Sequence, residues 1–225
     1  MCRMAAFSFK KDIDTYFIFK DLQKMAQYGM NAPHKDGWGV HLICTNSDVF
    51  HYKSIRSIYN DELPHFQACS GIMHARLASE GLDATPLQLH PFLDNDGDAF
   101  CHNGTVYGTP KTAPFKSDSL DLFNSIRKFS TTEQLIENIN SFTEKYNYTS
   151  LNFFLVKKNI IYILNRYKEQ DPRKQLYYKL WIKKNNEGVI IRSESLSDGD
   201  YTSLENGDLL EIKNGSYKKY NIIRK

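Results

Sequence analysis

Residues 2–8, Cys-Arg-Met-Ala-Ala-Phe-Ser, form a short and mostly apolar run at the start of the chain. A bounded run of this length is typical of a buried strand. The charged residues Lys10, Lys11 and Asp12 follow it closely, so this stretch does not have the long apolar centre of a secretory signal. The sequence therefore predicts a fold that begins with a strand, and it places a thiol, that of Cys2, at the second position.

Apolar residues at helical spacing predict a helix over residues 13–27, with Gly29 as its end. Helices are also predicted over 119–129 and 132–146, the latter capped by Thr131 and Gln134. The predicted strands cover 39–45, 48–53, 68–74, 99–102, 150–157, 160–166, 176–183, 188–192 and 209–212. This order, with two helices between groups of strands, indicates an α+β fold. Since no linker interrupts the pattern, we expect a single domain over residues 1–225.

Composition limits the classes of protein that the chain can represent. Its 29 Lys and Arg residues against 26 Asp and Glu give a net charge of +3, so no basic face for nucleic acid is expected. The longest apolar runs, such as Ile160–Leu164, are much shorter than the ~20 residues of a membrane span. Four cysteines without a C-x-x-C pair favour neither a disulfide scaffold nor a zinc knuckle. The cytosol is the expected compartment.

Cys2 is the first candidate for chemistry. If Met1 is removed, the thiol and the free α-amine belong to the same residue. An α-amine has a pKa of about 7.7–8.0, so that near neutral pH much of it can act as a base toward the thiol. The alternative is a cysteine that is buried as a small apolar residue, and position alone favours that alternative.

Two further motifs could shape a site. The sequence Asp36-Gly37-Trp38-Gly39 predicts a tight turn that enters a strand. Arg76 follows a predicted strand, where a guanidinium can bind a carboxylate through two hydrogen bonds. A packing role for Trp38 and a surface salt bridge for Arg76 are the alternatives.

The pair Asn103-Gly104 ends another predicted strand and offers an amide side chain beside a glycine N–H, which together can stabilise an oxyanion. A type I′ hairpin turn is the alternative for an isolated Asn-Gly pair. Asp118 comes just before a predicted helix, where capping by the Ser117–Asp118 segment is the ordinary explanation. A carboxylate at this place could also bind an ammonium group.

The order of these motifs resembles that of class II glutamine amidotransferases, which are N-terminal-nucleophile hydrolases. The likeness is greatest to small stand-alone members with a D-G-W-G element, and it extends to the late element Ser193-Glu194-Ser195-Leu196. The resemblance implies a four-layer αββα sandwich. It also implies a single amidotransferase domain that needs neither a metal nor an organic cofactor.

The resemblance also implies roles for particular residues. Cys2 is the expected nucleophile, and its α-amine is the expected base. Asn103 and the N–H of Gly104 are the expected oxyanion hole. The residues expected to bind or enclose a glutamine-like substrate are Arg76 at its α-carboxylate, Asp118 at its α-ammonium group, and Ser79, Gly37 and Trp38 around the pocket. His74 and His102 are expected to orient the backbone, and Cys44, Cys69 and Cys101 to be buried fillers.

The sequence departs from the family in two places. The family often has Trp-Ala-Thr-His after the arginine, whereas residues 77–80 are Leu-Ala-Ser-Glu. Ser79 can supply the hydroxyl, but Glu80 replaces a histidine and adds a negative charge. Ser195 replaces the proline of the late element. These changes leave the substrate preference open.

Three functions therefore remain in view. The first is a glutaminase or amidotransferase subunit that releases ammonia to a separate synthase partner, because the chain has no room for an attached one. The second is a hydrolase of γ-glutamyl amides or peptides. The third is a non-catalytic binding or regulatory domain. The expected ligand is a small molecule, with no nucleic acid and no membrane, and the sequence does not predict an oligomeric state.

Overall fold

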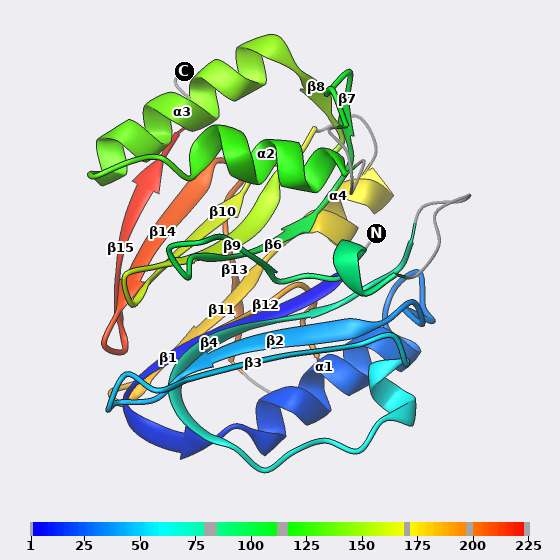
Figure 1. Cartoon of the computed structure of the whole chain (residues 1–225), viewed down its shortest axis with the longest axis vertical. Helices are drawn as coiled ribbons and strands as arrows, with labels where there is room; N and C mark the ends of the chain where they lie inside the picture. The colour runs from blue at the N-terminus through cyan, green and yellow to red at the C-terminus, as the bar shows by residue number, and fades with distance from the viewer. Residues whose placement is uncertain (1, 79–84, 112–116, 169–171, 197–199, 223–225) are drawn as a thin grey trace.

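The computed structural model of the chain describes residues 2–78, 85–111, 117–168, 172–196 and 200–222. Two large antiparallel sheets run through the molecule (Figure 1). The first has the order β13-β11-β12-β1-β4-β2-β3, and the second has the order β15-β14-β10-β9-β6-β5. A small ribbon of β7 and β8 stands beside the second sheet. The chain is therefore a mixed α+β structure, as its element pattern predicts.

The elements have the following bounds. The first sheet contains β1 (Arg3–Asp14), β2 (Trp38–Ile43), β3 (Val49–Ser54), β4 (Gln67–Ala75), β11 (Trp181–Lys184), β12 (Gly188–Arg192) and β13 (Thr202–Ser203). The second contains β5 (Phe92–Leu93), β6 (Ala99–Asn103), β9 (Asn152–Lys157), β10 (Ile160–Asn165), β14 (Asp208–Lys213) and β15 (Ser216–Asn221). The ribbon is β7 (Val106–Tyr107) and β8 (Asn147–Tyr148), and the helices are α1 (Tyr16–Tyr28), α2 (Asp118–Ile126), α3 (Thr132–Lys145) and α4 (Pro172–Tyr178).

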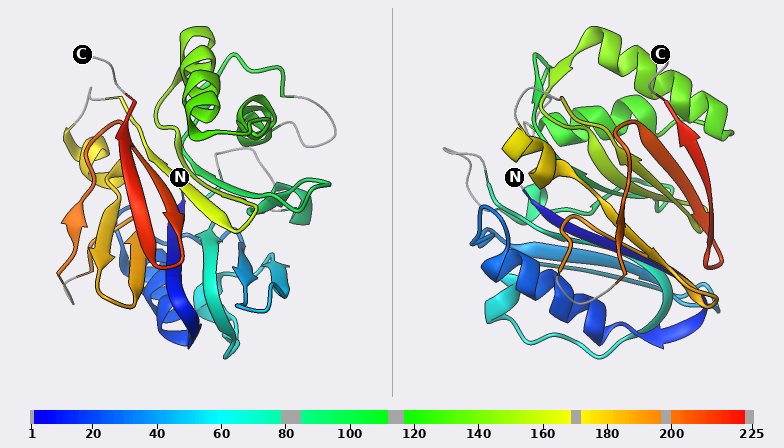
Figure 2. Two further views of the ribbon diagram at one scale, coloured as in Figure 1. Left: turned by 90° about the vertical axis from the view of Figure 1, so that its left-hand side faces the viewer. Right: turned by 180° about the vertical axis from the view of Figure 1, so that it is seen from behind.

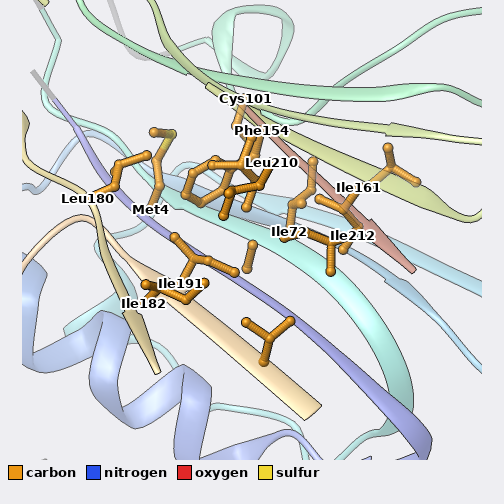
Figure 3. Close-up of a cluster of buried hydrophobic side chains, with 14 of the residues drawn as sticks. Met4, Ile72, Cys101, Phe154, Ile161, Leu180, Ile182, Ile191, Leu210 and Ile212 are labelled. Atoms are coloured by element: carbon orange, nitrogen blue, oxygen red, sulfur yellow. The ribbon is translucent and has the colours of Figure 1, made fainter. Parts of the chain in front are cut away.

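Three apolar clusters separate these elements into layers. The cluster between the two sheets joins residues such as Met4 and Ile191 to Phe154 and Leu210 (Figure 3). A second cluster lies between the second sheet and the helices α2 and α3, and a third lies between the first sheet and α1. The views in Figure 2 show α1 on the outer face of the first sheet and α2 and α3 on the outer face of the second.

The alternation of side chains along β1 decides which way residue 2 faces. Met4 and Ala6 lie in the cluster between the sheets, whereas Ala5 and Phe7 lie in the cluster beneath α1. Successive side chains of a strand point to opposite faces. Cys2 therefore shares the face of Met4, toward the second sheet.

Strand β1 is longer than the sequence pattern predicts. It continues to Asp14, with a shift in its register against β4 between Ser8 and Ile13. Ile13 pairs with Ala68 and packs against the α1-side cluster, so its apolar side chain belongs to the strand. The first helix consequently begins at Tyr16, whose N–H donates to the Asp14 carboxylate at 2.9 Å.

The predicted strand over 176–183 is wrong in its first half. Residues 172–178 form α4, which begins with a proline, a residue favoured in the first turn of a helix. Tyr177 and Tyr178 bury their rings against Tyr167. These tertiary contacts override the strand preference of aromatic residues. Strand β15 was not predicted, because its sequence is largely polar; it pairs with β14 after a turn at Asn214 and Gly215.

The four cysteines are all free. Cys101 is fully buried, but Cys44 and Cys69 are partly exposed and so are not the buried fillers that we expected.

Within the described parts of the chain, no helix has both the length and the apolar character that crossing a membrane requires.

Candidate active site

Cys2 lies directly before β1 of the first sheet and beside the end of β6 of the second sheet. Its side chain is 8% exposed, and its Sγ atom lies 4.0 Å from the carbonyl oxygen of Leu77. Its backbone nitrogen donates to Oδ1 of Asn103 at 2.8 Å, which joins β1 to the end of β6. Its carbonyl oxygen accepts from the hydroxyl of Tyr177 at 3.1 Å. Residue 2 is thus held through both ends of its backbone.

The amide of Asn103 is oriented by this contact. Because Oδ1 accepts from the Cys2 nitrogen, the amide nitrogen Nδ2 must face the other way. Nδ2 is buried and has no hydrogen-bond partner among the described residues. A buried donor without a partner costs free energy, and native structures keep few of them. Asn103 therefore presents a donor, next to the thiol-bearing residue, that a developing negative charge could use.

Gly104 lies at a very close approach of two chain segments. A Cβ atom at this position would stand 1.9 Å from the carbonyl oxygen of Ser150, so only glycine fits. Neither Asn103 nor Gly104 has the positive φ of a type I′ turn, and β6 pairs with β5 and β9, not with β7. The alternative of a simple hairpin turn is therefore wrong.

Arg76 is oriented by the segment around Gly37. The N–H of Arg76 donates to the carbonyl oxygen of Gly37 at 2.8 Å, and the N–H of Asp36 donates back to the carbonyl oxygen of Arg76 at 3.1 Å. Arg76 is 6% exposed, and Nη2 of its guanidinium donates to the side-chain oxygen of Gln88 at 3.2 Å. Its Nη1 is buried without a hydrogen-bond partner among the described residues. A buried cationic donor in this state is suited to binding a carboxylate.

The two residues of the D-G-W-G element named above have different positions. Gly37 has φ +96° and contacts Leu89, so that a side chain there would be both strained and crowded. Trp38 points to the opposite face of the sheet from Cys2. Its ring packs against Phe19 in the α1-side cluster, and its Nε1 donates to Asp61 at 2.9 Å. The structure thus gives Trp38 a packing position and does not bring it to the substrate contact that we expected.

Asp118 links the start of α2 to β7. Its Oδ2 accepts from the N–H of Val106 at 2.7 Å, and its Oδ1 accepts from the N–H of Ser119 at 2.9 Å. Ser117 caps the helix through its hydroxyl, which accepts from Leu120. The capping alternative therefore applies to Ser117. Asp118 is half-buried and close to the Asn103-Gly104 segment in the chain, with lone pairs that could still accept from an ammonium group.

The two histidines of these motifs, His74 and His102, are buried, and burial favours their neutral form. Burial lowers the pKa of His74 to about 3 and lowers the pKa of His102. The Nε2 atom of His102 lies 3.1 Å from the carbonyl oxygen of Ser150, which can only accept, and its Nδ1 lies 2.8 Å from the hydroxyl of Ser119. His102 thus joins β6 to α2. This geometry fits the orienting role expected for it.

Some expected features lie outside the described residues, namely Ser79 and Glu80. In the parts of the chain that the structure describes, no three His, Cys, Asp or Glu side chains gather as a metal site requires.

A group of buried side chains that was not predicted from the sequence packs beside the backbone of Cys2. Arg3 is fully buried and pairs with Glu194 at 3.0 Å, and its guanidinium lies 4.5 Å over the ring of Tyr177. The hydroxyl of Tyr177 also lies 3.2 Å from Nε2 of His34. Glu194 accepts from the N–H of Met30 at 3.0 Å. The late Ser-Glu-Ser-Leu element was a signal for Glu194, but nothing in the sequence indicated Tyr177.

Neither a known family profile nor a curated protein matches the sequence. Solved structures do match the fold. A glutamine aminotransferase class-II domain protein from Silicibacter pomeroyi aligns with a TM-score of 0.64 at 16% identity, over 98% of this chain and 99% of that one. A predicted glutamine amidotransferase from Pseudomonas aeruginosa aligns with a TM-score of 0.60 at 17% identity, over 96% and 99%. At these identities the likeness shows that this chain shares their fold over nearly its whole length.

Proposed function

We propose that the chain is a class II glutamine amidotransferase domain, with the N-terminal-nucleophile sandwich fold, that hydrolyses the γ-amide of glutamine. The observation that carries the proposal is the contact between Cys2 and Asn103. One hydrogen bond fixes the nitrogen of residue 2 and turns a partnerless donor, Nδ2, to the other side of the same amide. The fold shared with the two amidotransferase structures supports it.

Removal of Met1 turns the Cys2 nitrogen into a free α-amine in the proposed active enzyme. The amine takes the thiol proton directly or through one water, and the thiolate attacks the carbonyl carbon of the substrate amide. Nδ2 of Asn103 and the N–H of Gly104 stabilise the oxyanion that forms. The C–N bond then breaks, and the leaving nitrogen takes the proton from the α-ammonium group as ammonia departs.

The second half of the reaction releases glutamate. Water, deprotonated by the same α-amine, attacks the γ-glutamyl thioester, and the C–S bond breaks to regenerate the thiol. Arg76 binds the α-carboxylate through its partnerless Nη1, and Asp118 binds the α-ammonium group. The pocket beside them includes the Gly37 turn and, by the resemblance, Ser79. Substrates without the zwitterion leave Arg76 buried and unpaired, which penalises them.

The ammonia that the reaction releases has two fates in this proposal. A separate synthase partner uses it, or a stand-alone hydrolase releases it into solution. The third possibility, a non-catalytic binding or regulatory domain, would also use the buried donors of Asn103 and Arg76 to hold a ligand. It gives no role to the thiol of Cys2, so the activity of Cys2→Ala distinguishes it from an enzyme.

The test is glutamine hydrolysis by the processed protein, with ammonia and glutamate both measured. Wild type should release the two products in equal amounts, and Cys2→Ala should release neither. The matched control is Cys101→Ala, which removes another fully buried thiol, in the core between the sheets. Equal activity of wild type and Cys2→Ala would overturn the proposal.

A further inference from the structure

A cavity lies beside the segment that holds the backbone of Cys2, because Tyr178 in its wall follows Tyr177, whose hydroxyl bonds the Cys2 carbonyl. It has a volume of about 210 Å³ and is lined by Tyr107, Asn147, Tyr148, Thr149, Lys168, Lys174 and Tyr178. Its walls come from the β7–β8 ribbon and Thr149 after it, from Lys168, and from α4. Figure 1 shows these elements at the same end of the molecule as the N-terminus.

The order of strands places this cavity relative to the site. In the first sheet, β4 and the Arg76 that follows it lie on one side of β1, whereas β12 and β11, which α4 precedes, lie on the other. In the second sheet, β9 and β10, whose flanking segments line the cavity, lie on the side of β6 away from β5. Cys2 and Asn103 therefore stand between Arg76 and the cavity.

Direct contacts join the cavity wall to the site. Tyr178 follows Tyr177, whose hydroxyl bonds the carbonyl of Cys2. Thr149 accepts from the N–H of Thr105, the residue directly after Gly104, at 3.0 Å. The hydroxyl of Tyr178 in turn donates to Thr149 at 3.1 Å. The wall is thus continuous with the proposed oxyanion hole.

The lining is positively charged. Of the seven described residues that line it, two are lysines and none carries a carboxylate. Lys168 lies over the ring of Tyr148 at 4.9 Å, and the guanidinium of Arg166 lies 5.9 Å from the same ring. Within the described ranges, no carboxylate pairs with either lysine. Amide and hydroxyl groups of Asn147 and Thr149 add hydrogen-bonding capacity beside the charges.

We propose that this cavity binds a carboxylate carried by the amine half of the substrate, so that the enzyme acts on γ-glutamyl amides of amino acids. This proposal rests on the proposed function and deepens it. With the glutamyl α-carboxylate at Arg76 and the scissile carbonyl at Cys2 and Asn103, the amine half extends toward the lysines. Glutamine itself, whose leaving group is ammonia, leaves the cavity empty.

The reaction balances in the same way as glutamine hydrolysis. The C–N bond of the γ-amide breaks, the amino acid leaves after its nitrogen takes the proton of the α-ammonium group, and water later cleaves the thioester. Lys168 and Lys174 touch only the leaving half in this arrangement. They therefore set the preference among substrates and do not take part in the chemical step.

The test compares γ-glutamylglycine with γ-glutamylethylamide, which replaces the carboxylate by a methyl group. Wild type should hydrolyse γ-glutamylglycine with a kcat/KM about 10-fold higher or more, the effect of one charge-assisted contact. The double variant Lys168→Met/Lys174→Met should lose this preference and keep its kcat/KM for the ethylamide. The control Lys24→Met, on exposed α1 surface, should behave as wild type.

Equal hydrolysis of the two amides by wild type, or an equal loss for both in the double variant, would overturn the inference while leaving the proposed function intact. Calorimetric binding of γ-glutamylglycine to Cys2→Ala protein separates the two claims. Binding that weakens about 10-fold on loss of the lysines supports the cavity even if wild type shows no turnover. Absence of binding overturns the inference, and absence of glutamine hydrolysis by the processed wild type overturns the proposed function.

Discussion

The two sides of Cys2 differ in the contacts that their polar side chains make. On one side, here called the supporting side, Arg3, His34, Tyr177 and Glu194 contact one another or the backbone through an ion pair, ring contacts and hydrogen bonds, with only Nε of Arg3 left without a partner among the described residues. On the other side, Asn103 and Arg76 each keep one buried donor without a partner in the same described part of the chain, where neither belongs to an ion pair. Paired groups stabilise a fold, whereas the two donors beside Cys2 cost stability unless a ligand binds them.

The largest effect, a loss of kcat, is expected when Asn103 is replaced. Its partner across the sheet, Asn152, is equally buried. The Nδ2 atom of Asn152 donates to the carbonyl of Tyr178, and its Oδ1 accepts from the N–H of Arg166, so both ends of that amide have partners. Asn103→Ala should lower kcat by about 10²–10³-fold, the usual cost of losing an oxyanion donor. Asn152→Ala should lower the Tm and leave kcat nearly unchanged. Steady-state kinetics and thermal unfolding of both variants measure the difference, and the reverse pattern would contradict the comparison.

The next largest effect is a loss of kcat/KM for glutamine when Arg76 is replaced. Arg76→Gln should lower kcat/KM for glutamine by about 10–100-fold, because a charged hydrogen bond contributes about 1.5–3 kcal/mol. A γ-amide without the α-carboxylate, 4-aminobutyramide, should be hydrolysed equally by wild type and variant. A uniform loss on both substrates would mean that Arg76 only supports the fold.

On the supporting side, the expected loss is in stability. Glu194→Gln leaves the buried charge of Arg3 without its counter-charge. Since Glu194 is about one quarter exposed, we expect the free energy of unfolding to fall by about 2 kcal/mol, which lowers the Tm by about 4–8 °C. Asp14→Asn, at the exposed pair with His65, should cost much less, because water screens an exposed ion pair. Denaturant unfolding of the two variants measures both losses of stability. Equal losses would contradict the conclusion that the buried Arg3–Glu194 pair stabilises the fold more than the exposed pair.

Acidic pH should lower the free energy of unfolding through His34, which belongs to the supporting side. Burial lowers the pKa of His34 to about 3, whereas an unfolded histidine titrates near 6.5. The unfolded chain therefore binds more protons in this window, and the free energy of unfolding falls as the pH drops from about 6.5 toward 3. Between pH 6.5 and 5 we expect about 1–2 kcal/mol from His34. Urea unfolding at several pH values should show a shallower slope for His34→Gln; an unchanged slope would contradict the assignment.

The smallest effect is expected from Tyr177. Tyr177→Phe keeps the ring beneath Arg3 and removes only the hydroxyl that bonds the Cys2 carbonyl. Losing one hydrogen bond of about 1 kcal/mol should lower kcat about fivefold without changing KM, because Tyr177 positions the nucleophile and does not touch substrate. A change in KM alone would contradict this role.

Local patterns predicted much of the fold and part of the site. The helix over 132–146 is observed as α3, and its cap is as expected, since Thr131 accepts from the N–H of Gln134 at 3.3 Å. The sequence pattern predicted a strand where α4 is observed. It was wrong there because the burial of Tyr177 and Tyr178 depends on residues distant in sequence. The alternation of Trp38, Val40 and Leu42 with Gly39 and His41 already contained the signal that the tryptophan belongs to the core.

For the site, the order of motifs predicted that Cys2, Arg76 and Asn103 act together. The structure joins Cys2 to Asn103 by a hydrogen bond and places Sγ of Cys2 4.0 Å from the carbonyl oxygen of Leu77, the residue after Arg76; the roles of these residues stay a prediction. The orientation of the Asn103 amide could not follow from sequence, because it depends on one contact between residues 101 positions apart. The cavity with Lys168 and Lys174 is likewise assembled from separate segments, and neither lysine lies in a recognisable motif.

The central claim is that the thiol of residue 2, with its own freed amine, is the nucleophile. Its most direct test is mass spectrometry of the intact and digested protein after treatment with a glutamine analogue that carries a γ-diazoketone. We predict a chain without Met1 that gains one adduct, located on Cys2, and loses its glutaminase activity in parallel. Active protein that retains Met1, or an adduct on another residue while Cys2 stays free, would contradict the account.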